Sequence, residues 1–429
     1  MTSRRQRIAV IGGGISGLAS AYFLARQHDV VLMESAATLG GHANTVDITL
    51  DGHAMAVDAG FLVCNDRTYP NLLALFAELG VETYASDMSF GVSLHQGDLE
   101  WAGTSLDTVF AQRRRLLDPA FLGMLRDIMR FNRAAPANLA QCQAHPQSLR
   151  QLLSAGRYGM QFRDAYLLPM AAAIWSSAPA DILDFPAATF LRFCINHGLL
   201  QLNHRPQWRT VRGGSREYVR RIAATLPEVR LACRLHGVTR TETGVLVRSA
   251  GTIPRLEPFD AVVFATHAPQ TLALLQDATR EEHDVLSAFR YQHNLAWLHT
   301  DTDLMPRRRK VWSAWNYLGA RAEDGHQGVC VSYWLNRLQA LPGKREVMVT
   351  LNPPQAPAPE SRIASFDYEH PVFDQRAIDG QARLPAIQGR HRAWFAGAWT
   401  GYGFHEDGLK SALRVAADFD LAPSWASLP

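Results

Sequence analysis

One glycine-rich segment near the start of the chain limits the possible folds more than any other feature. It reads RIAVIGGGISGLASAYFLARQHDVVLMES, from Arg7 to Ser35. The apolar run at 8–11 predicts a buried strand, the apolar spacing at 15–26 predicts a helix, and the run at 30–33 predicts a second strand. A strand, a Gly-x-Gly-x-x-Gly turn and a helix in this order predict a dinucleotide-binding fold.

Each glycine of this turn, and the acid that follows, has a distinct physical role. Gly12 permits a tight turn, Gly14 lets the backbone approach a pyrophosphate, and Gly17 lets the helix pack closely on the strand. Phosphates favour the amino end of the helix, where free N–H groups and the helix dipole attract anions. Glu34 ends the second strand, where a carboxylate accepts hydrogen bonds from ribose hydroxyls. The motif leaves NAD and FAD as alternatives.

Length and composition exclude several other classes of protein. With 429 residues, 47% of them hydrophobic and 19% charged, the chain can bury a large core over more than one domain. The net charge of +3 is too small to indicate nucleic-acid binding. The five cysteines lack CxxC spacing, so neither disulfides nor a metal site are predicted, and a cytoplasmic location is expected. The longest apolar run, residues 165–175, is too short to span a bilayer, which leaves the inner face of the membrane as an alternative location.

A second glycine pair selects between the two dinucleotides. Gly40 and Gly41 follow the ribose-binding acid, and Asp58 and Gly60 precede a helix-like run. These motifs resemble the flavin-containing amine oxidase superfamily, which includes protoporphyrinogen oxidases and phytoene desaturases. The resemblance implies non-covalent FAD and an α/β fold, in which a Rossmann-type domain like that of glutathione reductase is interleaved with an α+β substrate domain. The family usually has arginine after the glycine pair, where this chain has His42.

The rest of the chain is expected to alternate between these two domains. Residues 1–80, 206–286 and 386–429 are assigned to the FAD-binding domain, and residues 81–205 and 287–385 to the substrate domain with its helical cap. Within the substrate domain, RRRKVWSAWNY at 307–317 predicts a solvated turn followed by an edge strand. An amphipathic rim that rests on anionic lipid headgroups is the alternative for this segment.

The resemblance implies flavin contacts from several further segments. The strand around Val238 would pass the adenine, and the last helix would direct its amino end at the flavin ring, where free N–H groups stabilise negative charge. Asp407, at the start of that helix, is either an N-cap or a ribityl contact. The expected cofactor-binding residues are Gly12, Gly14, Ser16, Gly17, Glu34, Ser35, Gly40, Gly41, His42, Asp58, Gly60, Arg212, Gly213, Gly214, Val238, Gly397, Asp407, Gly408 and Leu409.

The segment GYGFHEDGL near the carboxyl end supplies the candidates for proton transfer. A base near the flavin would remove a proton while a hydride leaves the neighbouring carbon. His405 and Glu406 are the first candidates for this base, and His293 is the third. The residues expected to bind the substrate are Trp175, Trp315, Tyr402 and Phe404.

Two departures from the family pattern concern the substrate side and a flavin contact, in that order. Amine oxidases commonly carry a lysine in the strand that here reads RYQHNLAWL, and the family often has an acid where this chain has Ala398. The end GYGFHEDGL resembles small bacterial FAD-dependent oxidoreductases of a fatty-acyl desaturase type, found with cyclopropane-synthase-type methyltransferases. This resemblance implies an FAD-dependent oxidoreductase acting on a hydrophobic substrate, such as a methyl-branched or unsaturated membrane acyl chain.

Three other functions stay open. They are amine oxidation with release of peroxide, isomerisation with reduced flavin, and flavin binding without turnover. The expected partners are a hydrophobic or lipid substrate, an electron acceptor that the sequence does not identify, and a peripheral membrane contact. A homodimer is an open alternative, and nucleic acid is not expected.

Overall fold

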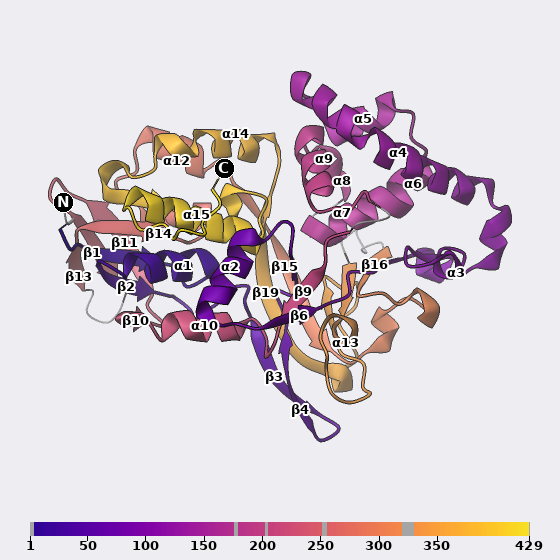
Figure 1. Cartoon of the computed structure of the whole chain (residues 1–429), viewed down its shortest axis with the longest axis horizontal. Helices are drawn as coiled ribbons and strands as arrows, with labels where there is room; N and C mark the ends of the chain where they lie inside the picture. The colour runs from indigo at the N-terminus through magenta and orange to yellow at the C-terminus, as the bar shows by residue number, and fades with distance from the viewer. Residues whose placement is uncertain (1–3, 176–178, 202–204, 251–254, 320–329, 429) are drawn as a thin grey trace.

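Two sheets organise the chain. The structure is a computed structural model that describes residues 4–175, 179–201, 205–250, 255–319 and 330–428. Figure 1 shows one lobe built from the amino-terminal, middle and carboxyl-terminal parts of the chain, and a second lobe that holds the larger sheet and the cap helices. The predicted α/β class with an interleaved second domain is confirmed.

The first sheet carries the dinucleotide-binding motif. It has the order β10-β2-β1-β14-β20, and every neighbouring pair is parallel. Its central strands are apolar on both faces, as in a parallel sheet covered from both sides. The strands are β1 (Arg7–Ile11), β2 (Asp29–Met33), β10 (Glu228–Arg230), β14 (Ala261–Phe264) and β20 (Ala393–Phe395).

Different elements cover the two faces of this sheet. Successive residues of β1 point to opposite faces of the sheet, so that Val10 and Ile11 belong to two different cores. Helices α1 (Ile15–Leu24), α2 (Pro70–Leu79), α10 (Arg216–Ala223) and α15 (His405–Asp418) pack on one face. The other face is covered by strands β11 (Leu235–Arg240), β12 (Val245–Ser249) and β13 (Leu256–Phe259) and by helices α11 (Ala268–Leu274), α12 (Arg280–Leu286) and α14 (Gln375–Arg383).

The position of α14 corrects one predicted domain boundary. Its buried Ala377, and Leu384 after it, belong to the same core as β1 and β14. The chain therefore returns to the dinucleotide-binding domain before residue 386. Small strands connect the two lobes: β3 (Thr45–Leu50), β4 (His53–Asp58), β5 (Cys64–Asn65), β6 (Thr83–Ala85) and β9 (Trp208–Val211).

The second sheet has seven strands in the order β19-β15-β18-β17-β16-β7-β8. The predicted edge strand after residue 312 is wrong, because β16 pairs with β17 on one side and with β7 on the other. Trp315 therefore begins an interior strand. The elements are β7 (Phe90–Leu94), β8 (Leu99–Ala102), β15 (Arg290–His299), β16 (Trp315–Gly319), β17 (Cys330–Trp334), α13 (Leu335–Leu338), β18 (Met348–Leu351) and β19 (Arg362–Val372).

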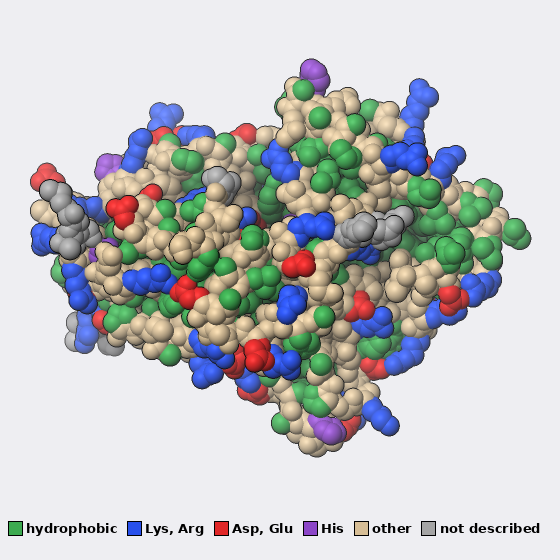
Figure 2. Space-filling model, in the orientation of Figure 1, with side chains coloured by type: hydrophobic (Ala, Val, Ile, Leu, Met, Phe, Trp, Pro, Cys, Tyr) green, Lys and Arg blue, Asp and Glu red, His purple; other side chains and the backbone are tan. Residues whose placement is uncertain are grey.

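Helices between β8 and β9 form the cap over this sheet. Hydrophobic side chains also gather on the outside of the cap, at the end of the molecule formed by α3 and α4 (Figure 2). Within the described ranges, no helix is long and apolar enough to cross a bilayer. The helices are α3 (Leu106–Val109), α4 (Pro119–Ala144), α5 (Leu149–Ala155), α6 (Met160–Phe162), α7 (Leu168–Trp175), α8 (Pro179–Leu183) and α9 (Ala187–Asn196).

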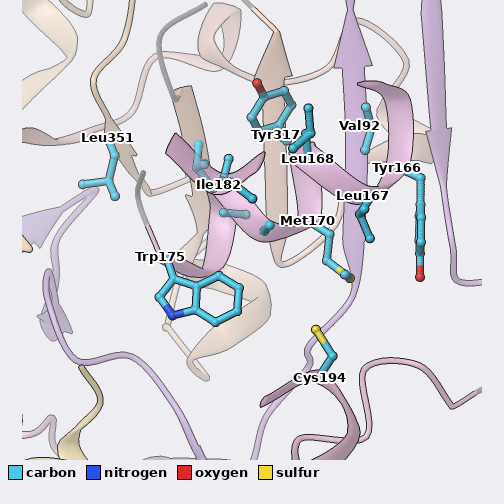
Figure 3. Close-up of a cluster of buried hydrophobic side chains, with 14 of the residues drawn as sticks. Val92, Tyr166, Leu167, Leu168, Met170, Trp175, Ile182, Cys194, Tyr317 and Leu351 are labelled. Atoms are coloured by element: carbon cyan, nitrogen blue, oxygen red, sulfur yellow. The ribbon is translucent and has the colours of Figure 1, made fainter. Parts of the chain in front are cut away.

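The cap is fixed to the sheet by a large apolar core. Figure 3 shows Leu168 and Met170 of α7 between Tyr317 on β16 and Cys194 on α9. All four side chains are buried. Burial of this size holds α7 and α9 firmly, and both helices carry residues of the cavity described next.

Candidate active site

A cavity of about 820 Å³ is lined by residues from both lobes. Its dinucleotide side consists of the segments that follow β1, β2, β14 and β20. Because these strands are parallel, their carboxyl ends meet at one edge of the sheet, which is where such sheets bind ligands. Its cap side consists of Met88, Ile174, Trp175, Phe193, His197, Leu199, Trp315, Tyr333 and Leu351.

The turn between β1 and α1 has the geometry of a phosphate cradle. Gly12 has a φ of +107°, and a Cβ there would stand 2.7 Å from the carbonyl oxygen of Ala265. A Cβ on Gly17 would stand 1.8 Å from the carbonyl oxygen of Gly12, so only glycine lets α1 pack this closely. A Cβ on Gly14 would meet nothing within 4 Å, which leaves open space above the amino end of the helix.

The ribose-binding acid is held at the edge of this cradle. Glu34 Oε2 accepts the N–H of Gly13 at 2.6 Å, and Oε1 accepts the N–H of Ala36 at 2.7 Å. The second glycine motif lies against the first, since Gly40 donates its N–H to the carbonyl of Gly13 at 2.9 Å. The predicted residues that line the cavity on this side are Gly12, Gly14, Ser16, Glu34, Ser35, Gly40, Gly41, His42, Gly60 and Gly397.

Two buried polar atoms of the cavity wall lack a hydrogen-bond partner among the described residues. They are Nε2 of His42 and Nε1 of Trp315. His42 stacks on Tyr368 with ring centroids 4.9 Å apart, and burial holds its pKa well below the usual range, so the imidazole is neutral. Buried polar atoms are almost always satisfied, so such atoms in a cavity wall fit a bound ligand.

FAD fits the dinucleotide side on these observations. The open cradle at Gly14 suits the pyrophosphate, Glu34 suits a ribose, and His42 offers a neutral imidazole where the family usually has arginine. The amino end of α15 begins beside the cavity at Phe404 and His405, and its free N–H groups favour negative charge on the ring.

Four further histidines line the cavity that the sequence did not single out: His197, His236, His267 and His370. The last two contact polar side chains of the second sheet. His370, on β19, accepts a hydrogen bond at Nδ1 from Asn294 at 2.9 Å, and burial lowers its pKa to about 4. His267 follows β14, and its Nδ1 lies 2.9 Å from Glu369 Oε2. His267 follows the carboxyl end of a strand, as Glu34 does, so the same position in the sequence pattern could have identified it. His370 carried no such signal, because only the pairing of β19 with β15 brings it to the site.

His405 is the one predicted base that lines the cavity. Its ring stacks on Phe61 with centroids 3.8 Å apart, and its Nε2 lies 3.2 Å from the Tyr218 hydroxyl. Burial lowers its pKa to about 3. His405 is therefore a neutral imidazole held from two sides, next to Tyr402 and Phe404, which line the cavity as predicted for substrate contacts.

The prediction that Glu406 faces the substrate is wrong. Its carboxylate accepts the N–H of Leu72 at 2.9 Å and the side-chain amide of Asn71 at 2.7 Å. These donors lie in the first turn of α2, so Glu406 satisfies the free end of a neighbouring helix. His293 also lies outside the cavity wall, with 79% of its side chain exposed and its Nε2 3.3 Å from Glu369.

Several predicted cofactor residues act behind the cavity wall. Asp407 accepts the N–H of Phe404 at 3.0 Å from the third helical position, and burial raises its pKa to about 6. Asp58 accepts hydrogen bonds from the backbone N–H and hydroxyl of Ser215. Arg212 is exposed and pairs with Glu82 at 3.0 Å. The predicted residues outside the wall are Gly17, Asp58, Arg212, Gly213, Gly214, Val238, Asp407, Gly408 and Leu409.

The fold and this site together define a flavin-dependent oxidoreductase with a dinucleotide-binding domain and a separate substrate domain. The family model for flavin-containing amine oxidoreductases matches residues 15–298, more than half of the sequence, and the chain belongs to that family. Its cofactor is FAD, as predicted.

Known proteins resemble this chain to different extents. Carotenoid phi-ring synthase from Chlorobaculum tepidum is 30% identical over 127 residues, which cover 27% of this chain and 20% of that protein. A CLA-producing fatty acid isomerase from P. acnes has a TM-score of 0.67 at 15% identity, covering 98% of this chain and 100% of its own. Cyclohexylamine oxidase from Brevibacterium oxydans IH-35A has a TM-score of 0.67 at 14% identity, covering 97% and 100%. Structural matches at these identities establish the fold alone.

Proposed function

We propose that this protein is an FAD-dependent oxidoreductase that takes a hydride from a hydrophobic substrate, such as a methyl-branched or unsaturated membrane acyl chain. The apolar lining of the cap side of the cavity is the observation that supports this proposal. Its wall is formed by the aromatic or aliphatic side chains of Met88, Ile174, Trp175, Phe193, Leu199, Trp315, Tyr333 and Leu351. Such a surface binds apolar chains by removing them from water.

The charges around the cavity also favour a neutral substrate. Among the described residues of its wall, the only carboxylates are Glu34 and Glu369. Glu34 belongs to the dinucleotide side, and Glu369 contacts His267 and His293. The cap side contributes His197, whose pKa burial lowers to about 4. A cationic amine would lose its hydration there without a counter-charge, which is costly.

The proposed reaction removes two hydrogens from adjacent carbons. Bound FAD supplies the acceptor for the hydride, a neighbouring carbon releases a proton, and a C=C bond forms. We assign the proton to Nδ1 of neutral His405, the ring nitrogen other than the one in contact with the Tyr218 hydroxyl. Although burial makes its imidazole a weak base, a weak base suffices where the hydride leaves first, because the adjacent C–H then becomes strongly acidic. The aromatic rings of Tyr402 and Phe404 would hold the chain beside it.

Anaerobic absorbance of the FAD-loaded protein tests this function. Total membrane lipid should bleach the long-wavelength flavin band, and His405→Phe should slow the bleaching by roughly 10²- to 10⁴-fold while FAD stays bound. Phenylalanine keeps a ring against Phe61 and removes only the imidazole nitrogens. Unchanged kinetics in this variant would remove His405 from the mechanism, and no bleaching with any lipid would overturn the substrate class.

Experiments on the same FAD-loaded protein distinguish two alternative functions. Isomerisation is favoured by the structural likeness to a fatty acid isomerase, and it predicts a changed double-bond position with no net oxidation of the acyl chain. Amine oxidation predicts peroxide on addition of a polyamine or arylalkyl amine. The uncharged cap side and the absence of lysine from β15 both argue against amine oxidation.

A further inference from the structure

The outside of the cap carries an exposed apolar surface. It consists of Leu106, Leu116, Leu117, Leu122, Met129 and Met160, with exposed fractions of 77, 47, 88, 42, 60 and 74%. Six of the nine exposed large hydrophobic residues in the described ranges belong to this one stretch, and none of the six lines the cavity. Exposed apolar side chains that cluster in this way mark interaction sites.

Arginine alternates with these apolar side chains along α4. Leu122, Arg126, Met129 and Arg133 are spaced by four, three and four residues, so they share one face of the helix, and all four are exposed. The opposite face of α4 is buried through Phe121, Met124 and Phe131. The outer face of α4 therefore mixes apolar and basic side chains. The solvent-facing side of a helix that packs on a core normally carries polar and charged residues.

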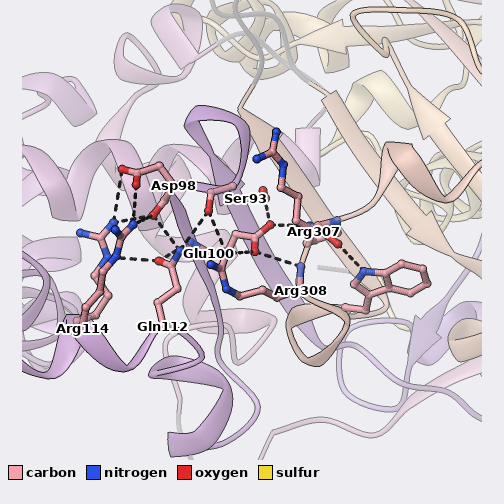
Figure 4. Close-up of polar contacts among 11 residues, drawn as sticks. Ser93, Asp98, Glu100, Gln112, Arg114, Arg307 and Arg308 are labelled. Atoms are coloured by element: carbon pink, nitrogen blue, oxygen red, sulfur yellow. Dashed lines mark hydrogen bonds and ion pairs between the residues drawn. The ribbon is translucent and has the colours of Figure 1, made fainter.

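Leu117, the most exposed side chain of this surface, and Leu116 lie on a rigid turn. Residues 113–117 form a 3₁₀ turn, η2 (Arg113–Leu117), which polar contacts hold at both ends. Figure 4 shows the contacts of Gln112. Before it, Gln112 donates to the carbonyls of Gly97 at 3.1 Å and Asp98 at 2.9 Å. After it, Asp118 caps α4 by accepting the N–H of Ala120 at 3.0 Å. Leu116 and Leu117 are thus presented in a fixed position, which lowers the entropic cost of binding.

Positive charge surrounds this apolar surface. Residues 105–163 contain nine arginines against three aspartates, a net charge of +6, whereas the whole chain carries only +3. The basic run at 307–310 lies alongside, because Lys310 pairs with Asp107 at 3.0 Å. Arg308 of the same run is fixed by the buried Glu100 at 2.8 Å (Figure 4). In Figure 2, basic side chains flank the hydrophobic ones at this end of the molecule.

We propose that this surface docks the protein on an anionic phospholipid bilayer. Leucine and methionine side chains would enter the boundary between headgroups and acyl chains, and the arginines would contact lipid phosphates. A second copy of the chain fits less well, because two arginine-rich faces would repel each other. The proposal is independent of the catalytic function, since binding to vesicles requires no turnover.

Sedimentation of the FAD-loaded full chain with vesicles tests the proposal. Vesicles of phosphatidylcholine that contain phosphatidylglycerol should bind the protein, vesicles of phosphatidylcholine alone should bind it weakly, and added salt should weaken binding. Arg126→Gln with Arg133→Gln should weaken binding about fivefold for each arginine. Leu117→Gln with Met129→Gln should weaken it about tenfold or more.

Leu256→Gln is the matched control, because Leu256 is 55% exposed on β13, far from the cap in the chain. It should leave vesicle binding unchanged. The proposal is overturned if the wild-type protein ignores anionic vesicles, or if the control loses as much binding as the cap variants. It is also overturned if Leu117→Gln with Met129→Gln abolishes a concentration-dependent dimer in sedimentation velocity, because the surface then joins two copies.

Discussion

Glu406 in α15 accepts the backbone N–H of Leu72 at 2.9 Å and so joins the helix beside the cavity to the amino end of α2. Its other oxygen accepts the N–H of Asn71 at 3.2 Å and the side-chain amide of that residue at 2.7 Å. Only 3% of Glu406 is exposed, so these donors would have no water to replace the carboxylate. The contact fixes where His405, one residue earlier, stands in the cavity wall.

Replacing Glu406 with alanine is expected to destabilise the fold. The variant leaves buried N–H groups of α2 without an acceptor, which costs about 1–3 kcal/mol. Urea denaturation measures the loss. Glu281→Ala, at the exposed start of α12, is the control and should change stability by less than about 0.5 kcal/mol. A stable variant whose flavin is no longer reduced by substrate would instead restore Glu406 as the base.

The two glycines of the cradle are expected to separate folding from cofactor binding. Gly14→Ala has room within the protein, so the stability of the FAD-free protein should not change. Its methyl group would enter the cofactor space and cost about 1–3 kcal/mol of FAD binding, roughly 5- to 150-fold in Kd. Gly17→Ala would collide with the Gly12 carbonyl and should unfold the protein at lower urea. Titration of the FAD-free variants with FAD measures the Kd, and urea denaturation measures their stability. Equal destabilisation by the two substitutions would contradict the separate roles of Gly14 and Gly17.

His42→Phe is expected to weaken FAD binding without harming the fold. The variant keeps an aromatic ring on Tyr368 and removes a buried nitrogen that has no partner in the described part of the protein. The FAD-free protein should be as stable as the wild type or about 1 kcal/mol more stable. The Kd for FAD should rise by about tenfold, the equivalent of one lost hydrogen bond. An unchanged Kd would show that His42 does not face the cofactor.

The stability of the protein is expected to fall as the pH falls below 6.5. Burial lowers the pKa of His405 from its usual 6.5 to about 3, so between these values the unfolded chain binds a proton that the folded chain does not. This residue should contribute a slope of about 1.4 kcal/mol per pH unit. His405→Phe should therefore flatten the dependence of unfolding free energy on pH, measured by urea denaturation at saturating FAD.

Asp407 should act in the opposite direction over part of this range. Burial raises its pKa from 3.8 to about 6, so the folded chain holds a proton there that the unfolded chain releases. Its contribution to stability grows as the pH falls from about 6 to 3.8. In Asp407→Asn, the free energy of unfolding should therefore fall more steeply as the pH is lowered. An unchanged dependence on pH would show that the Asp407 carboxyl is more solvated than its buried position indicates.

Local chemistry explains which parts of the site were predictable. The cradle at Gly12 and Gly14, the acid Glu34 and the helix that begins at His405 each depend on residues close together in the sequence, where turn geometry and strand ends leave a pattern. The sequence predicts a helix that starts at Asp407 and leaves Glu406 in a loop facing the substrate, whereas the helix begins at His405. Successive residues of a helix point about 100° apart, so His405 faces the cavity and Glu406 faces α2.

The sequence by itself determined the dinucleotide-binding motif and the α/β class, because these depend on short-range spacing and on apolar periodicity. Its resemblance to a known family implied the FAD cofactor. Only the tertiary structure decided which polar side chains share the cavity. His370 reaches it through the pairing of β15 with β19, and the apolar surface of the cap appears only when α4 turns Met129 outward and Phe131 inward. Contacts between residues that are distant in the chain are set by packing, and packing leaves no local pattern to read.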